Sequence, residues 1–237
     1  MEHVRVEVND GIADVVMNRP KVNALDEQLL AELAQGMREV AEDDGVAGVL
    51  LRGEGSCLSA GLDLNVVGSL EGDDLGAFID RLDEALTACF FLPKPLAVPV
   101  SGHAIAGGLV IALTADHVVL GRGEQKLGLT ELAVGVPFPR TAFEIIRLAL
   151  PPRALRRFVY EAESFGPEEA FELGCGDVLA DDAVAAARAW LEKVTSRALD
   201  TFSFVKAQLR KDAWERIARQ THAERRALLE ALQNSRR

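Results

Sequence analysis

The chain has 237 residues, of which 49% are hydrophobic and 27% are charged, and its net charge at pH 7 is −11. A chain of this length and composition can bury one sizeable core without disulfides or metals. The acidic balance disfavours nucleic acid as the main partner, because nucleic-acid-binding surfaces are basic. No apolar run reaches the roughly 20 residues of a membrane helix, and the first residues lack a secretory-signal pattern. We therefore expect a cytoplasmic protein with no membrane partner.

The three cysteines, Cys57, Cys89 and Cys175, are widely separated and lie outside any C-x-x-C spacing. Disulfide frameworks and zinc sites normally need paired or clustered cysteines. We expect no metal site, and we expect the three thiols to be packed in the core of a protein from a reducing compartment.

The N-terminal region predicts a β-hairpin followed by a helix. Apolar and polar residues alternate over Val4–Val8 and Ile12–Met17, and Asn9-Asp10-Gly11 between them is typical of a tight turn. Apolar residues then recur at helical spacing from Asp26 to Asp43, and Asp26 suits the N-cap of that helix.

The next region alternates strands and helices, which is typical of an α/β domain with a parallel sheet. A helix is predicted at Leu75–Phe91, and the loop Ser101–Gly108 opens another that runs to about Thr114. Pro99 argues against a strand at this position, because proline lacks the backbone N–H that a strand residue donates to its neighbour. Short apolar runs predict doubly buried strands at Val46–Leu51, Leu96–Val100 and His117–Leu120.

After Pro137 the pattern is almost entirely helical, with a lone strand at Asp177–Leu179. From Phe202 onward basic residues outnumber acidic ones, so this tail could contact a phosphate or form a solvated helix face; composition favours the solvated face. We predict an α/β core at residues 1–160 and a helical region at 161–237. The helices are expected at Arg140–Ala149, Arg153–Glu161, Pro167–Leu173, Asp181–Arg197 and Asp212–Gln233.

Three glycine-rich segments follow predicted strands: Ser59–Leu64, Gly102–Gly108 and Gly128–Gly135. In an open parallel sheet, such loops gather at the carboxyl edge, where ligands usually bind. Glycine lets a backbone N–H approach a ligand oxygen closely, and two such donors would stabilise the enolate oxygen formed from a thioester. Glycine loops alone are weak evidence, because most of them are simple turns.

Taken together, the motifs resemble those of the crotonase (enoyl-CoA hydratase/isomerase) superfamily, and the similarity runs from the N-terminus to at least Gly176. Their order and spacing are specific in combination, whereas no single motif would be. The matching pieces are Asn18-Arg19-Pro20, Asn23-Ala24-Leu25, Ser59–Leu64, Ala106-Gly107-Gly108, Leu113–Asp116 and Gly128–Glu131.

The resemblance implies a spiral of ββα units, with a helical C-terminal region that serves trimerisation and covers the CoA pocket. It implies an acyl-CoA substrate, no further cofactor, and a homotrimer or a dimer of trimers. The two oxyanion-hole donors of the family correspond to the backbone N–H groups of Leu62 and Gly107. The CoA-binding residues correspond to Lys21, Ala24, Leu25 and Ala60.

The acidic residues then favour one reaction of that family. Its hydratases carry a glutamate three residues beyond the second oxyanion glycine, where this chain has Val110, and another that corresponds to Glu131. Hydration suits two carboxyl groups, whereas moving a double bond from position 3 to position 2 needs one base. An apolar setting would raise the pKa of that base toward the working range. We therefore predict a Δ3,Δ2-enoyl-CoA isomerase in which Glu131 is catalytic.

Several alternatives stay open. The chain could be a hydratase or another crotonase-type acyl-CoA enzyme, or an acyl-CoA-binding protein without turnover. Leu64, Val110 and Phe138 are candidates for the acyl pocket, although Phe138 suits simple core packing equally well. We expect His103 to be a satisfied loop histidine and Asp116 to make a structural contact before a strand.

Overall fold

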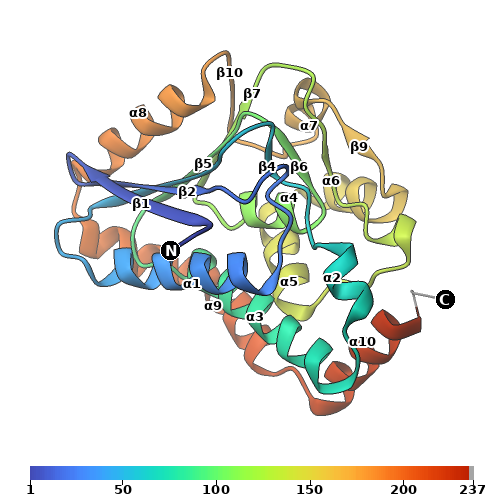
Figure 1. Cartoon of the computed structure of the whole chain (residues 1–237). Coiled ribbons are helices and arrows are strands. Elements are labelled where there is room, and N and C mark those ends of the chain that lie inside the picture. The colour runs from blue at the N-terminus through green and yellow to red at the C-terminus, as the bar shows by residue number, and fades with distance from the viewer. Residues whose placement is uncertain (235–237) are drawn as a thin grey trace.

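The structure, a computed structural model, describes residues 1–234 and contains two sheets (Figure 1). The larger sheet has the order β1-β2-β3-β5-β7-β10 and the smaller has the order β4-β6-β8-β9. The strands are β1 (Val4–Asn9), β2 (Ile12–Met17), β3 (Gly48–Gly53), β4 (Cys57–Ser59), β5 (Leu96–Val100), β6 (His103–Ile105), β7 (His117–Gly121), β8 (Leu127–Gly128), β9 (Ser164–Phe165) and β10 (Val178–Ala180).

The helices connect and cover these strands. The predicted N-cap is confirmed, since the Asp26 carboxylate accepts a 2.8 Å hydrogen bond from the backbone N–H of Leu29. The helices are α1 (Glu27–Glu42), α2 (Leu64–Ser69), α3 (Gly72–Phe90), α4 (Gly107–Ala112), α5 (Arg140–Ala149), α6 (Pro152–Arg156), α7 (Pro167–Glu172), α8 (Ala183–Thr195), α9 (Leu199–Ala218) and α10 (His222–Asn234).

The larger sheet is parallel apart from the predicted hairpin, in which β1 and β2 pair antiparallel. The turn places Asp10 and Gly11 at φ +52° and +75°, as the Asn-Asp-Gly sequence predicts. Pro99 pairs only with Val119 of β7, because the ladder between β3 and β5 ends at Ala97. The missing donor of proline is therefore tolerated in this strand.

Helices cover both faces of this sheet, which is why β5 and β7 in its centre are apolar on both sides (Figure 1). Helix α8 packs on β3, β5 and β7, and Leu50, Ala97 and Leu191 belong to the small core between them. Helix α1 packs on β1 and β2, and α3 lies against α1 within the main core. All three cysteines are buried, as predicted.

The smaller sheet lies inside segments that were expected to be loops. The glycine- and serine-rich segment Gly53–Gly61 is typical of a loop but contains β4, and the expected loop Ser101–Gly108 contains β6, so the expectation of plain loops is wrong. These strands have two or three residues, too few for the alternation of apolar and polar residues to show in the sequence. Their pairing is what brings the glycine-rich segments side by side.

The C-terminal helices also differ from the expectation of one helix at Asp212–Gln233. Helix α9 begins earlier, at Leu199, and α10 is separate. The Thr221 hydroxyl accepts from the backbone N–H of Glu224 at 3.2 Å, and the Glu224 carboxylate accepts from the backbone N–H of Thr221 at 2.8 Å. This reciprocal pair is a capping box, which starts a new helix at that point.

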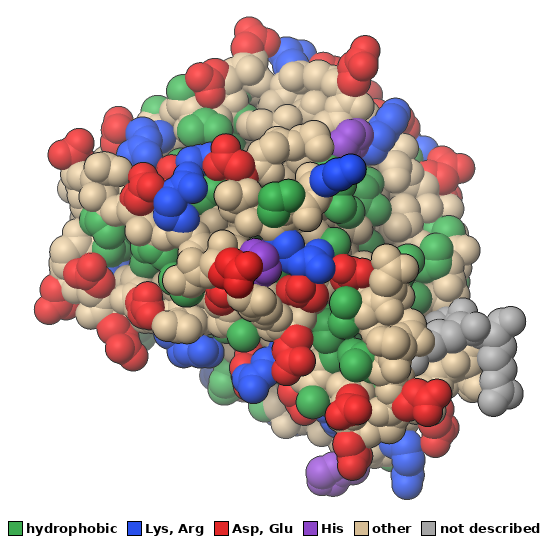
Figure 2. All heavy atoms as spheres, in the orientation of Figure 1, with side chains coloured by type: hydrophobic (Ala, Val, Ile, Leu, Met, Phe, Trp, Pro, Cys, Tyr) green, Lys and Arg blue, Asp and Glu red, His purple; other side chains and the backbone are tan. Residues whose placement is uncertain are grey.

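Residues beyond position 160 contribute to both sheets. Strand β9 pairs with β8, and β10 pairs with β7, so the segment expected to be a lone strand is an edge strand of the larger sheet. The division of the chain at residue 160 stays a prediction. None of the helices within residues 1–234 is long and apolar enough to cross a membrane. Acidic and basic side chains are interspersed over the face that Figure 2 shows.

Candidate active site

The site is built where the loop after β4 touches the loop after β6. A Cβ atom added at Gly61, which has φ +84°, would lie 2.9 Å from the Cβ of Ala106 and 3.2 Å from the backbone nitrogen of Gly107. A Cβ atom at Gly108 would lie 2.1 Å from the carbonyl oxygen of Ser59. The backbones approach so closely that only glycine fits at these two positions.

The backbone N–H of Leu62 is left unused by the local pairing. Leu25 and Leu62 form an isolated parallel bridge, in which Leu25 N–H donates to the Gly61 carbonyl at 2.8 Å and Asp63 N–H donates to the Leu25 carbonyl at 2.9 Å. Successive peptide groups of an extended segment point to opposite sides. The N–H of Leu62 therefore points away from the bridge, and within residues 1–234 no hydrogen bond occupies it.

The backbone N–H of Gly107 is the first of helix α4, and such a group has no partner inside its own helix. The preceding residue, Ala106, has φ +51° and ψ −126°, a conformation that costs a non-glycine residue about 1–3 kcal/mol. This strained peptide sets the direction of the Gly107 N–H. Both predicted oxyanion donors thus lie on neighbouring loops.

Glu131 is buried, with 8% of its surface exposed, and directly precedes a 3₁₀ turn at Leu132–Val134. Its Oε2 atom is buried without a hydrogen-bond partner in the described part of the chain. Burial raises the pKa of the carboxyl to about 7, and a hydrogen bond from its own backbone opposes this with a smaller effect. A carboxyl group with this pKa and a free Oε2 can both accept and release a proton near neutral pH.

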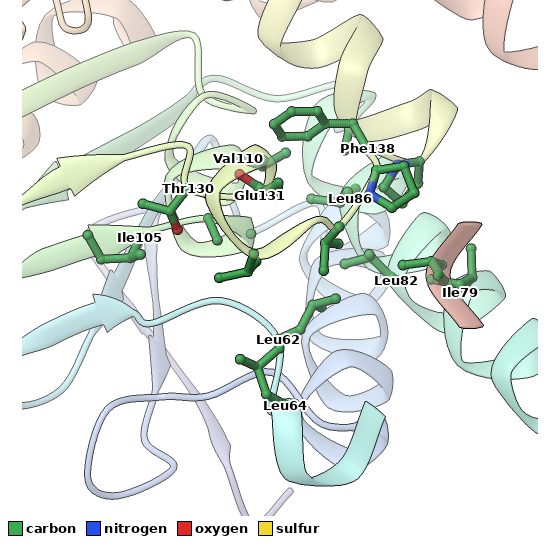
Figure 3. A pocket seen from close by; sticks show the side chains of 18 of the residues that line it. Leu62, Leu64, Ile79, Leu82, Leu86, Ile105, Val110, Thr130, Glu131 and Phe138 are labelled. Atoms are coloured by element: carbon green, nitrogen blue, oxygen red, sulfur yellow. The ribbon is translucent and has the colours of Figure 1, made fainter. Parts of the chain in front are cut away.

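One pocket contains Leu62, Gly107 and Glu131 together. Figure 3 shows Glu131 beside Val110, with Phe138 above and Leu62 and Leu64 below. The side chains that line the pocket are aliphatic, proline or phenylalanine except at Thr130 and Glu131. The structure therefore brings together the predicted catalytic residue, both predicted donors and the three acyl-pocket candidates.

A sequence model of the family described as enoyl-CoA hydratase/isomerase matches residues 7–237. The chain belongs to this family. The probable enoyl-CoA hydratase EchA17 of Mycobacterium tuberculosis (strain H37Rv) is 32% identical and aligns over 97% of this chain and 90% of its own length. A probable enoyl-CoA hydratase of Bacillus subtilis is 29% identical, over 77% of this chain and 70% of its own length.

Solved structures agree with this assignment. The probable enoyl-CoA hydratase EchA3 of M. tuberculosis H37Rv superposes with a TM-score of 0.85 at 26% identity, covering 97% of this chain and 94% of that one. A second structure of that mycobacterial protein, described as an apo enoyl-CoA isomerase, gives a TM-score of 0.84 with 98% of each chain covered. The fold of this chain is accordingly the crotonase fold of the enoyl-CoA hydratases.

Of the four residues of this chain that were predicted to bind CoA, only Ala60 lines the pocket. Its backbone N–H donates to the Val22 carbonyl at 3.0 Å, which places the segment containing Lys21, Ala24 and Leu25 beside the Ala60 loop. Lys21 is exposed, Ala24 is half-buried and Leu25 is fully buried. The side chain of Leu25 is thus a packing residue, and the CoA roles of all four stay predictions.

Arg19 is a positioning residue that the sequence did not single out. Its guanidinium donates to the Ala24 carbonyl at 3.0 Å and pairs with Asp26 at 2.8 Å and with Asp63 at 2.9 Å. Asp63 in turn caps α2 through the N–H groups of Asn65 and Val66. Arg19 therefore ties the predicted CoA segment to the loop of the first oxyanion donor. Its place in the matching Asn-Arg-Pro motif was the available signal.

Two further expectations hold. His103 is a satisfied loop histidine, since its Nδ1 accepts from the backbone N–H of Lys126 at 3.0 Å. Asp116 makes a structural contact, since it accepts from the backbone N–H of Leu96 at 2.9 Å.

Two cations of the basic tail behave differently from both alternatives considered for it, whereas Lys211, Arg219 and Arg226 are exposed, as a solvated face requires. Lys206 and Arg210 are buried, and each lies 2.6 Å from a carboxylate oxygen of Asp116. These two cations are neither a phosphate site nor a solvated face. They fasten α9 to the loop before β7, an arrangement that requires a facing carboxylate from another element.

Proposed function

We propose that this chain is a Δ3,Δ2-enoyl-CoA isomerase that uses Glu131 as its single base. One observation carries the proposal: within the described lining of the pocket, Glu131 supplies the sole carboxylate, and Val110 provides an aliphatic wall where a second acid would stand. A shift of a double bond needs one proton acceptor, because the same proton can leave C2 and return at C4.

The reaction runs through a dienolate. The backbone N–H groups of Leu62 and Gly107 would hold the thioester oxygen and strengthen their hydrogen bonds as negative charge develops there. Glu131 takes the proton from C2, the electrons move into the carbonyl, and the double bond relocates as Glu131 returns the proton to C4. The aliphatic lining excludes water, which would otherwise compete for this proton.

Hydration of a 2-enoyl-CoA is the second candidate, and the names of the mycobacterial and Bacillus relatives favour it. A bound water needs two to four polar partners. Thr130 and Glu131 could hold a water at this site, but Val110 offers no second carboxyl group to share the two proton transfers of hydration. The isomerase proposal rests on that missing acid. The third candidate is an acyl-CoA-binding protein without turnover.

The test follows the conjugation of a 3-enoyl-CoA by ultraviolet absorbance. We expect wild type to be active and Glu131→Gln to lose about 100-fold or more in kcat, because general acid–base catalysis contributes this much. The exposed Glu124 provides a matched control, and Glu124→Gln should keep wild-type activity. Equal inactivity of wild type and Glu131→Gln, with acyl-CoA still bound, would favour the binding protein. Hydration of 2-enoyl-CoA that survives Glu131→Gln would favour a hydratase with other residues.

A further inference from the structure

The pocket has an open end and a closed end. Leu64 and Val134 line it with 60% and 51% of their surfaces exposed, so they mark the mouth. Ile79, Leu82 and Leu232 line it as well, but each is at most 3% exposed. Figure 3 shows Ile79 and Leu82 on the far side of the pocket from Ile105, next to a short piece of the C-terminal helix. The closed end therefore lies between α3 and α10.

Helix α10 is fixed in this position by polar contacts. Arg225 donates to the Gly76 carbonyl at 3.0 Å and pairs with Asp80 of α3 at 2.7 Å. Glu224 forms an ion pair with Arg140 at the start of α5. With contacts to both neighbouring helices, α10 forms a wall of the pocket.

Among the described residues that line the pocket, none at the closed end offers a polar side chain to a ligand. The two polar lining residues, Thr130 and Glu131, belong to the reacting end, whereas the helices at the far end contribute Ile79, Leu82 and Leu232. A hydroxyl or carboxylate on the far part of an acyl group would lose its water there without gaining a partner. A hydrocarbon would bury its surface without that cost.

We infer that the acyl group is an unsubstituted hydrocarbon chain and that Leu232 of α10 sets its maximum length. This inference rests on the acyl-CoA function proposed above. With the thioester held near Leu62 and Gly107, the chain extends past Leu82 until its terminal methyl meets Leu232. Each added methylene strengthens binding about fourfold up to that point, and further carbons find no space.

The test measures the affinity of saturated acyl-CoAs, from butanoyl-CoA to hexadecanoyl-CoA, by titration calorimetry. In wild type the affinity should rise with chain length to a maximum and then stop rising. Leu232→Ala should move the maximum to longer chains, and Leu232→Phe should move it to shorter ones. Leu228, on the same helix and packed outside the pocket, is the matched control, and Leu228→Ala should leave the maximum in place.

The same maximum in wild type and in both Leu232 variants would overturn the length inference, and so would an equal shift in Leu228→Ala. Equal affinity for a plain chain and for its ω-hydroxy counterpart would overturn the hydrocarbon inference. Saturated thioesters cannot isomerise, so the shifted maxima support this inference even where the isomerase assay fails. Absence of binding to every acyl-CoA would overturn both. Circular dichroism of each variant checks that α10 still folds.

Discussion

Glu131 combines two properties that oppose one another. Its position in an apolar pocket gives the carboxyl a pKa of about 7, which suits proton transfer at neutral pH. The same burial makes the ionised form costly to the folded protein, because Oε2 has no hydrogen-bond partner in the described chain. Both effects lead to measurements that depend on pH.

The activity should depend on the ionised form of Glu131. Since the proposed base must be deprotonated to accept the C2 proton, kcat/KM should rise tenfold per pH unit below about 7 and level off above it. A pH profile of 3-enoyl-CoA isomerisation measures this directly. A profile that stays flat between pH 5 and about 8 would contradict the role of Glu131 as the base.

The stability should show the opposite trend. The pKa of Glu131 in the folded protein, about 7, lies above the ordinary value of 4.5 for a glutamate. The protonated carboxyl therefore favours the folded state below pH 4.5, and this advantage is lost as the pH rises through 7. Glu131→Gln should be more stable than wild type by about 3 kcal/mol at pH 8, with the difference shrinking in acid. Urea unfolding at several pH values tests this, and a gain that does not change with pH would contradict it.

At the scale of elements, a buried ion pair joins α9 to the larger sheet. Asp116 faces both Lys206 and Arg210, and its other contact is the backbone N–H of Leu96 in β5. Burial lowers the pKa of Lys206 to about 8, with the nearby Asp116 opposing the shift. The two cations depend on this one carboxylate for compensation.

Removing that carboxylate should therefore be costly. Asp116→Asn leaves two buried cations without their counter-charge, and we expect a loss of about 3–5 kcal/mol in the free energy of unfolding. Denaturant titration measures the loss, and hydrogen exchange should show that α9 loses protection first. The triple change Asp116→Asn, Lys206→Met and Arg210→Met should recover part of the stability. A loss below about 1 kcal/mol for Asp116→Asn would contradict the structural role of the pair.

At the scale of the whole molecule, apolar side chains of α9 and α5 are left exposed in the described part of the chain. Leu209 of α9 is 70% exposed, Val205 lies one turn before it, and both line a shallow groove together with the exposed Leu148 of α5. Surfaces of this kind are typical of association sites. We propose that copies of this chain meet through α9 and α5, in the trimer or dimer of trimers that the family resemblance implies.

The mass in solution tests this association. Wild type should sediment as three or six chains of 25.6 kDa. Leu209→Glu should reduce the assembly to single chains, because a charge cannot be buried there without a partner. Val8, an exposed apolar residue of β1, gives the control Val8→Glu, which should leave the mass unchanged. A wild-type protein that sediments as a single chain at micromolar concentration would contradict the proposal.

Local patterns in the sequence were sufficient for much of the architecture. The hairpin turn, the Asp26 cap and the apolar runs of β3, β5 and β7 depend on neighbouring residues, and all were predicted close to their observed places. The order of the motifs likewise identified the family, and it put Glu131 and Val110 at their positions before any contact was known. Periodicity and capping express themselves within a few residues, so one sequence suffices to detect them.

Tertiary structure decided what depends on residues far apart in the chain. The smaller sheet pairs strands of two or three residues, which carry no period of their own. Lys206 can be buried because it pairs with Asp116, which lies 90 positions earlier in the chain. No local sequence pattern predicts such a distant partner. The apolar end of the pocket needs Leu232 from the last helix beside Leu82 from the third. The sequence determined the elements and the candidate chemistry, whereas folding alone decided which side chains share a cavity, because burial arises from distant contacts.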